Sequence, residues 1–138
     1  MPLVVTVLKI SKEYQLRQAV FLHRQLRHFG YDAICLTDAE YIPNVKTYPF
    51  YHQFPGWWSK MELFNSKHKI IGNQSIFYMD LDTLILRDFS PLMSDTELRM
   101  INDFYHPTHS QSGVMNINQA SKKQIWKQWM RNASHYMN

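Results

Sequence analysis

The sequence has a single cysteine, Cys35, so no disulfide can form within the chain. Its position in the apolar run DAICL indicates a small buried hydrophobic residue, and a reducing compartment is the simplest interpretation. No hydrophobic run is long enough to span a membrane, and the N-terminal MPLVVTVLK lacks the basic start of a signal peptide. We therefore expect a cytoplasmic protein with no membrane span.

Internal repeats, low-complexity tracts and linkers are also missing. The chain has 138 residues, of which 45% are hydrophobic and 19% are charged, and this composition is not that of a disordered protein. Its length suits one core, so we expect one domain spanning residues 1–138. A formal net charge of +4 favours an anionic partner, which could be a nucleotide diphosphate, a nucleic acid or an acidic surface.

Patterns typical of strands and helices alternate along the chain. A β-branched apolar run predicts a buried strand at Leu3–Leu8, and apolar positions spaced by three and four predict a helix capped by Ser11 and ended by Gly30. Further strands are expected in DAICL, VKTYP and SIFYM and at residues 99–102 and 114–117. Trp57, Met61 and Phe64 are expected to share one helical face. A capping box at Ser121 and Gln124 is expected to begin the last helix. We predict an α/β fold with a mostly parallel sheet flanked by helices.

Two carboxylates, Asp80 and Asp82, directly follow the apolar strand in SIFYMDLDTLIL. Open α/β sheets bind ligands beyond the carboxyl ends of their strands. On an extended chain the two α-carbons would be about 6–7 Å apart with both side chains on one side, so that both could approach Mn²⁺ or Mg²⁺. Such a cation can neutralise a diphosphate leaving group. The alternative is a strand-end turn whose carboxylates are simply solvated.

Three segments, PGWWSKMELF, YMDLDTLIL and QSGVMNIN, occur in an order that resembles GT-A-type glycosyltransferases. The resemblance is to small bacterial and phage-like members related to the glycogenin-like family 8, and it runs from VVTVLK through the last helix. It implies a metal-dependent enzyme that moves a sugar from a nucleoside-diphosphate sugar donor to a hydroxyl of a glycan or other acceptor. It also implies that Asp80 contacts the ribose or the metal and that Asp82 is the principal metal ligand.

The resemblance assigns further side chains to the donor. Lys60, before the D-x-D strand, would face the donor phosphate or sugar, and the ring of Tyr14 would stack on the base. One of Trp57 and Trp58 would border the pocket while the other packs in the core. Surface or purely structural roles remain the alternatives for all four residues.

A small polar motif before the last expected strand is assigned to the donor sugar. Gln111 and Ser112 would contact the sugar there, and Gly113 would allow close approach. Asp103 is a weaker candidate for a hydrogen bond to a sugar hydroxyl. A turn entering a strand and a solvated acid are the alternative interpretations.

Family members usually continue beyond the last helix into acceptor-site residues and often a metal-binding histidine, whereas this sequence ends at Asn138. We therefore expect a fold shortened at its C-terminus. The histidines that could complete a metal site are His106, His109 and His135. They lie in the wrong motif context, so none of them is assigned to the metal. No catalytic residue is assigned either.

Two alternative functions remain. The chain could be an inactive or incomplete nucleotide-sugar-binding relative that needs a homodimer or partner chain. It could also be a small basic nucleic-acid-binding protein, although no nucleic-acid motif is present and nucleic acid is the less favoured partner. The second alternative depends on the cations of the last helix: Lys122, Lys123, Lys127 and Arg131.

Overall fold

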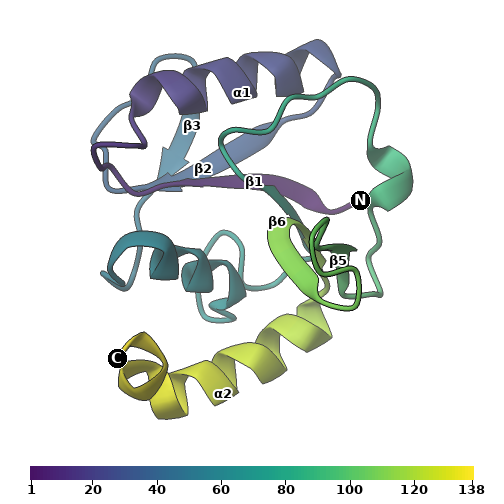
Figure 1. The fold of residues 1–138 in the computed structure, drawn as a ribbon. Coiled ribbons are helices and arrows are strands. Elements are labelled where there is room, and N and C mark those ends of the chain that lie inside the picture. The colour runs from purple at the N-terminus through teal and green to yellow at the C-terminus, as the bar shows by residue number, and fades with distance from the viewer.

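The computed structural model describes all 138 residues and contains a six-stranded sheet between two layers of helices (Figure 1). The strands are β1 (Leu3–Leu8), β2 (Ala33–Thr37), β3 (Lys46–Tyr48), β4 (Ile76–Met79), β5 (Arg99–Asn102) and β6 (Ser110–Ile117). Helix α1 (Leu16–His28) covers one face, and the 3₁₀-helix η1 (Gly56–Phe64) and helix α2 (Gln119–Met137) cover the other. A short 3₁₀-helix, η2 (Ser90–Leu92), follows β4.

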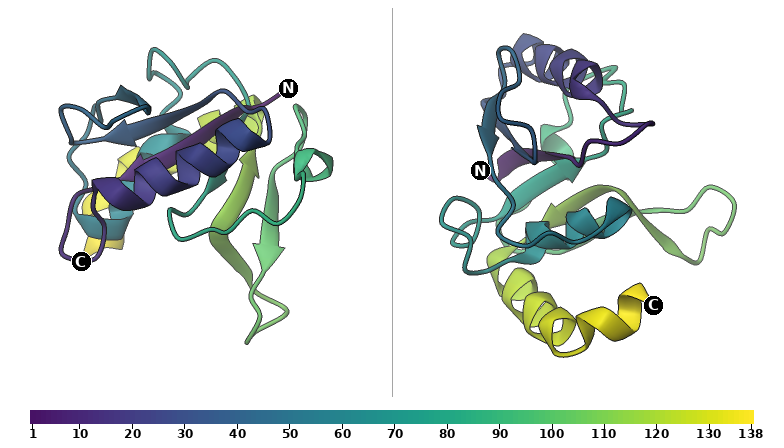
Figure 2. Two further views of the ribbon diagram at one scale, coloured as in Figure 1. Left: turned by 90° about the horizontal axis from the view of Figure 1, so that it is seen from above. Right: turned by 90° about the vertical axis from the view of Figure 1, so that its left-hand side faces the viewer.

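The sheet is mixed, with strand order β3-β2-β1-β4-β6-β5. The pairs β1–β2, β1–β4 and β2–β3 are parallel, whereas β4–β6 and β5–β6 are antiparallel. The prediction of an α/β fold with a mostly parallel sheet is therefore confirmed. The β5–β6 hairpin extends away from the rest of the molecule (Figure 2).

The first helix ends where the sequence predicts and begins later. Gly30 follows the helix with φ +84°, a left-handed conformation that glycine adopts without strain. The N-cap is Gln15, so the prediction that Ser11 caps this helix is wrong. Instead, the Ser11 hydroxyl accepts a hydrogen bond from the backbone N–H of Tyr14 at 3.0 Å. Ser11 therefore shapes the loop that presents Tyr14.

The segment after the proline-containing loop forms a 3₁₀-helix, and this changes which residues share a face. Because side chains three residues apart eclipse in such a helix, Trp58, Met61 and Phe64 line up and pack on the core. The Trp57 side chain is 80% exposed. The prediction that Trp57, Met61 and Phe64 share one helical face is therefore wrong for Trp57.

The last helix also departs from its predicted start and face. Asn118 is the N-cap of α2, so Ser121 lies inside the helix and does not cap it. Trp126 and Trp129 are buried as expected, but Met130 is exposed. None of the helices combines the length and apolar character needed to cross a membrane.

Lys122 is fully buried at the start of α2, in contrast to the solvated basic face considered for this helix. Its ammonium group donates hydrogen bonds to the backbone carbonyls of Ile71 and Gln74. This side chain therefore fastens α2 to the turn before β4 and is removed from any nucleic-acid-binding surface. Burial lowers the pKa of Lys122 to about 8.

We predict that replacing Lys122 changes the pH dependence of stability. Between its folded pKa of about 8 and its ordinary value of 10.5, the unfolded chain binds a proton that the folded chain has lost, so the free energy of unfolding rises with pH. From pH 7 to pH 9.5 the wild type should gain about 2 kcal/mol relative to Lys122→Met. Urea unfolding of both proteins across this range measures the difference, and parallel pH profiles would contradict the prediction.

His23 makes the free energy of unfolding depend on pH in the acidic range. It is buried in α1, its Nε2 lies 2.7 Å from Thr6 Oγ1, and burial followed by the nearby Arg27 charge lowers its pKa from 6.5 to about 4. As the pH falls below 6.5 the unfolded chain protonates first, so the free energy of unfolding decreases. We expect a loss of about 3 kcal/mol between pH 7 and pH 4 that His23→Gln does not show. Equal acid sensitivity of the two proteins in urea titrations would rule out this assignment.

Candidate functional site

Asp80 lies at the carboxyl edge of the sheet, where β4 ends between β1 and β6. Its backbone N–H donates to the carbonyl of Gly113 at 2.8 Å, which extends the β4–β6 pairing by one residue. Because β6 is antiparallel to β4, residues 111–113 project past the end of β4. Residues distant in sequence therefore meet at this edge.

Lys60 joins this edge from η1 and binds both strands. Its Nζ lies 2.7 Å from Asp80 Oδ1 and donates to Ser112 Oγ at 3.3 Å. Both members of the ion pair are partly exposed, so the pair can rearrange when a charged ligand arrives. The structure thus brings together three of the predicted donor residues: Lys60, Asp80 and Ser112.

Buried Glu62 holds η1 in the position that presents Lys60. Its Oε1 accepts hydrogen bonds from the backbone N–H of Tyr51 and from the Asn65 side chain, each at 3.0 Å. His52 Nδ1 lies 3.3 Å from the other carboxylate oxygen. These contacts satisfy a fully buried carboxylate and fix the helix at its C-terminal half.

Tyr78 is a member of the site that sequence reasoning missed. Its hydroxyl donates to Asp80 Oδ1 at 2.5 Å, and Lys60 Nζ lies 5.2 Å from the centre of its ring. Burial first, and then the Asp80 carboxylate, raise the pKa of Tyr78 well above its ordinary value, so the hydroxyl remains a donor. The available signal was strand alternation, because a residue two before Asp80 faces the same side.

The D-x-D motif forms a turn, which corrects the extended geometry expected from the sequence. Thr83 N–H donates to the Asp80 carbonyl at 3.1 Å, and buried Leu81 anchors the turn in the core. Asp82 is exposed beside it. The charges of both carboxylates act on Tyr14, since burial first, and then Asp82 and Asp80, raise the pKa of its hydroxyl.

Gly113 and Gln111 lie next to the Asp80 carboxylate. The Gly113 N–H donates to Gln111 Oε1 at 3.2 Å. A β-carbon at position 113 would lie 2.7 Å from that oxygen and 3.4 Å from Asp80 Oδ2. The absence of a side chain therefore lets β6 approach the carboxylate closely.

Three predicted donor residues make no hydrogen bond or ion pair with this group: Tyr14, Trp57 and Asp103. Asp103 lies in the β5–β6 loop, where its Oδ1 accepts hydrogen bonds from the N–H groups of Tyr105 and His106 at 2.8 and 3.2 Å. It organises the hairpin loop. Trp57 is exposed, with its ring edge-to-face with Trp58 at 6.0 Å, and lies one 3₁₀ turn from Lys60.

Asp80 and Asp82 have the chemistry of a partial cation site. Nowhere do three or more histidine, cysteine or acidic side chains gather in a metal-binding arrangement. Mg²⁺ and similar cations are often held by one or two carboxylates together with substrate phosphates and water. Exposed Asp82 and the Oδ2 atom of Asp80 fit that mode, whereas Oδ1 of Asp80 is occupied by Lys60 and Tyr78.

A second polar cluster missed by the sequence analysis lies at the ends of β1 and β2. Asp38 Oδ1 accepts a hydrogen bond from the Ile10 N–H at 3.0 Å, and Lys9 Nζ lies 3.9 Å from Asp38 Oδ2. Lys9 also donates to Gln53 Oε1 at 3.1 Å. The rule that selected Asp80, a polar residue just after a buried strand, also applies to Lys9 and Asp38.

Comparison with known proteins adds no assignment. No protein-family model matches the chain, and no curated protein matches it with significant similarity. The interpretation of the site therefore depends on its own geometry and on the motifs in the sequence. The defining features are the Lys60 ammonium group, the carboxylates of Asp80 and Asp82, and the close approach of the β6 backbone at the carboxyl edge of a mixed sheet.

Proposed function

We propose that this chain is a GT-A-type glycosyltransferase domain that binds a nucleoside-diphosphate sugar with Mn²⁺ or Mg²⁺ and transfers the sugar to an acceptor hydroxyl. The observation that carries the proposal is the convergence of Lys60, Asp80 and Ser112 at the end of β4. The charges of Asp82 and Asp80 both raise the pKa of Tyr14, after the larger effect of burial. Basic and acidic groups side by side suit a diphosphate bound together with a cation.

In this proposal Asp82 and Asp80 would hold the cation, which would supply Lewis acidity to the diphosphate leaving group. Tyr78 keeps Asp80 oriented through its hydroxyl hydrogen bond. Lys60 exchanges its ion pair with Asp80 for a donor phosphate, so that the carboxylate is released as the diphosphate arrives. This exchange keeps charge balanced at the half-buried edge.

Recognition of the rest of the donor is assigned to the surrounding side chains. The half-exposed ring of Tyr14 stacks on the base, and Ser112 and Gln111 contact the sugar through hydroxyl and amide groups. Gly113 leaves room for the Gln111 amide oxygen and for Asp80 Oδ2 beside β6. Lys9 and Asp38 extend the polar edge toward the nucleoside.

We predict that divalent metal strengthens nucleotide binding through Asp82. Calorimetric titration with UDP and GDP should show at least about tenfold tighter binding in Mn²⁺, a difference of about 1.4 kcal/mol, and Asp82→Ala should remove this gain. Exposed Asp82 costs little stability to replace. Asp32→Ala, which removes an exposed carboxylate from the loop before β2, is the matched control. Equal nucleotide affinity with and without metal would overturn the proposal.

We also predict that Lys60→Met weakens UDP or GDP binding about tenfold while the fold is retained, because one charge-assisted contact to phosphate contributes about 1.5–3 kcal/mol. The control is Lys67→Met, which removes an exposed lysine from the following loop. Thermal unfolding of both variants checks the fold. If Lys60→Met binds nucleotide as tightly as wild type, the Lys60–Asp80 pair is only a surface ion pair.

A further inference from the structure

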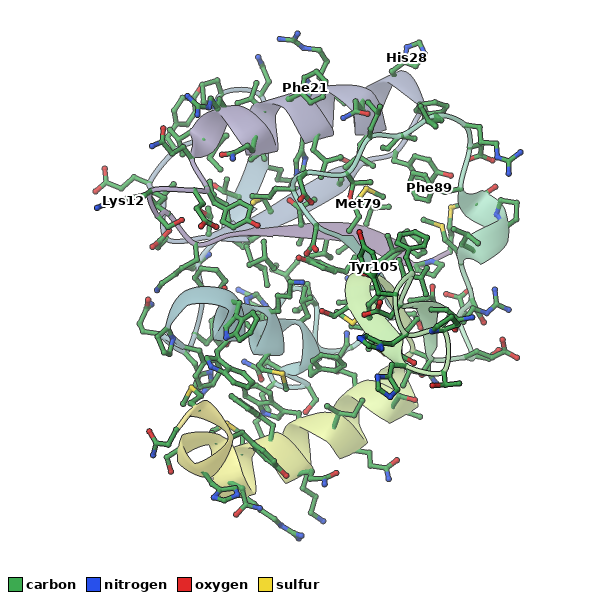
Figure 3. All side chains as sticks on the ribbon, in the orientation of Figure 1. Lys12, Phe21, His28, Met79, Phe89 and Tyr105 are labelled. Carbon is green, nitrogen blue, oxygen red and sulfur yellow. The ribbon has the colours of Figure 1, made fainter.

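An apolar cavity of about 520 Å³ lies on the opposite side of the sheet from Lys60. Its floor is formed by Phe77 and Met79 of β4 and Val114 of β6, and its roof by most of residues 83–92. Met79 and Phe89 lie on the α1 side of the sheet (Figure 3). The volume is within the range of about 300–1,000 Å³ that is typical of small-molecule sites.

Stacked aromatic rings form one wall of the cavity. The Phe89 ring stacks on Phe77 at 5.1 Å and on Tyr31 at 4.4 Å, with interplanar angles of 19° in both pairs. Around the cavity, Leu84, Leu86 and Leu92 are 64%, 83% and 51% exposed. Three exposed leucines around an apolar cavity form a hydrophobic surface that water solvates poorly.

The charges at the cavity have different surroundings. Arg87 lines it and makes no hydrogen bond or ion pair within the chain. The neighbouring Asp88 is already occupied, since Tyr31 and Ser90 donate hydrogen bonds to its carboxylate. A free guanidinium beside a hydrocarbon surface suits an anionic group that is attached to an apolar chain.

The cavity is continuous with the D-x-D turn. Met79 and Val114 are cross-strand partners immediately next to Asp80 and Gly113, and they face the cavity because successive strand residues point to opposite sides. Thr83 both lines the cavity and donates its N–H to the Asp80 carbonyl. The cavity therefore reaches the turn that carries Asp82.

We infer that this cavity binds the hydrocarbon chain of an anionic amphiphile, with the chain against Phe77, Met79 and Phe89 and the acidic group at Arg87. The aromatic wall and exposed leucines select an apolar chain, and the unpaired guanidinium selects its anionic end. This inference does not require the proposed transferase function, because the cavity lies on the other face of the sheet from Lys60 and is lined by different residues.

The test is calorimetric titration of the full chain with dodecyl phosphate below its critical micelle concentration, without nucleotide. We expect saturation at one molecule per chain. Butyl phosphate should bind at least tenfold more weakly because it buries less hydrocarbon, and dodecanol about tenfold more weakly because it lacks the charge. No binding of dodecyl phosphate, or binding of many molecules per chain, would overturn the inference.

Exposed residues allow variants that retain the fold. Leu84→Ala combined with Leu86→Ala should weaken dodecyl phosphate binding about tenfold, whereas Leu98→Ala, at an exposed leucine outside the cavity, should not. Arg87→Gln should weaken dodecyl phosphate binding about tenfold and leave dodecanol unchanged. Arg24→Gln on the exposed side of α1 is its control.

Two further outcomes separate this inference from its competitors. If the leucine substitutions change the mass of the chain in size-exclusion light scattering and leave dodecyl phosphate affinity unchanged, the surface is an interface with a second copy and the inference is wrong. UDP titration with Mn²⁺ on the same preparations reports on the proposed function separately. Loss of nucleotide binding with intact dodecyl phosphate binding would contradict the proposed function and leave this inference standing.

Discussion

Asp80 and Gly113 lie side by side because β6 pairs with β4 in the register that joins Met79 to Val114. The hydrogen bond from Asp80 N–H to Gly113 carries this pairing one residue past the end of β4. A slip of one residue would turn every side chain of one strand to the other face, so the ion pair between Lys60 and Asp80 and the contact with Ser112 both require this register. The geometry of the whole edge follows from that single antiparallel pairing.

Strand alternation then gives the two faces of the same edge different chemistry. Tyr78 and Asp80 face η1, where Lys60 forms an ion pair with Asp80. Phe77 and Met79 face α1 and line the apolar cavity. The polar site and the cavity are therefore separated by the thickness of one strand and joined at the D-x-D turn. A molecule with one apolar and one polar part would match both surfaces.

The buried charges serve mainly to position the helices on the η1 face. Glu62 accepts two hydrogen bonds at 3.0 Å and so fixes η1, which carries Lys60. Lys122 holds α2 in place through hydrogen bonds to two backbone carbonyls. Removing either would leave its partners buried and unpaired, which is more costly than losing an exposed ion pair. The half-exposed pair of Lys60 and Asp80 is by contrast free to exchange partners.

Local patterns in the sequence predicted a strand at the position of each observed strand and the end of α1, because short apolar runs and a glycine at positive φ act over a few residues. The last strand was predicted too short: β6 begins at Ser110, so residues 111–113 lie inside the strand and not before it. The position of Asp80 at a strand end followed in the same way. Only the tertiary structure decided that η1 is a 3₁₀-helix that exposes Trp57, that Lys122 is buried, and that Tyr78 is bonded to Asp80. The carbonyl partners of Lys122 lie 51 and 48 residues away and are supplied by helix packing, which leaves no local signal. Tyr78 is only two residues from Asp80, so strand alternation places both on one face, but their hydrogen bond is visible only in the structure.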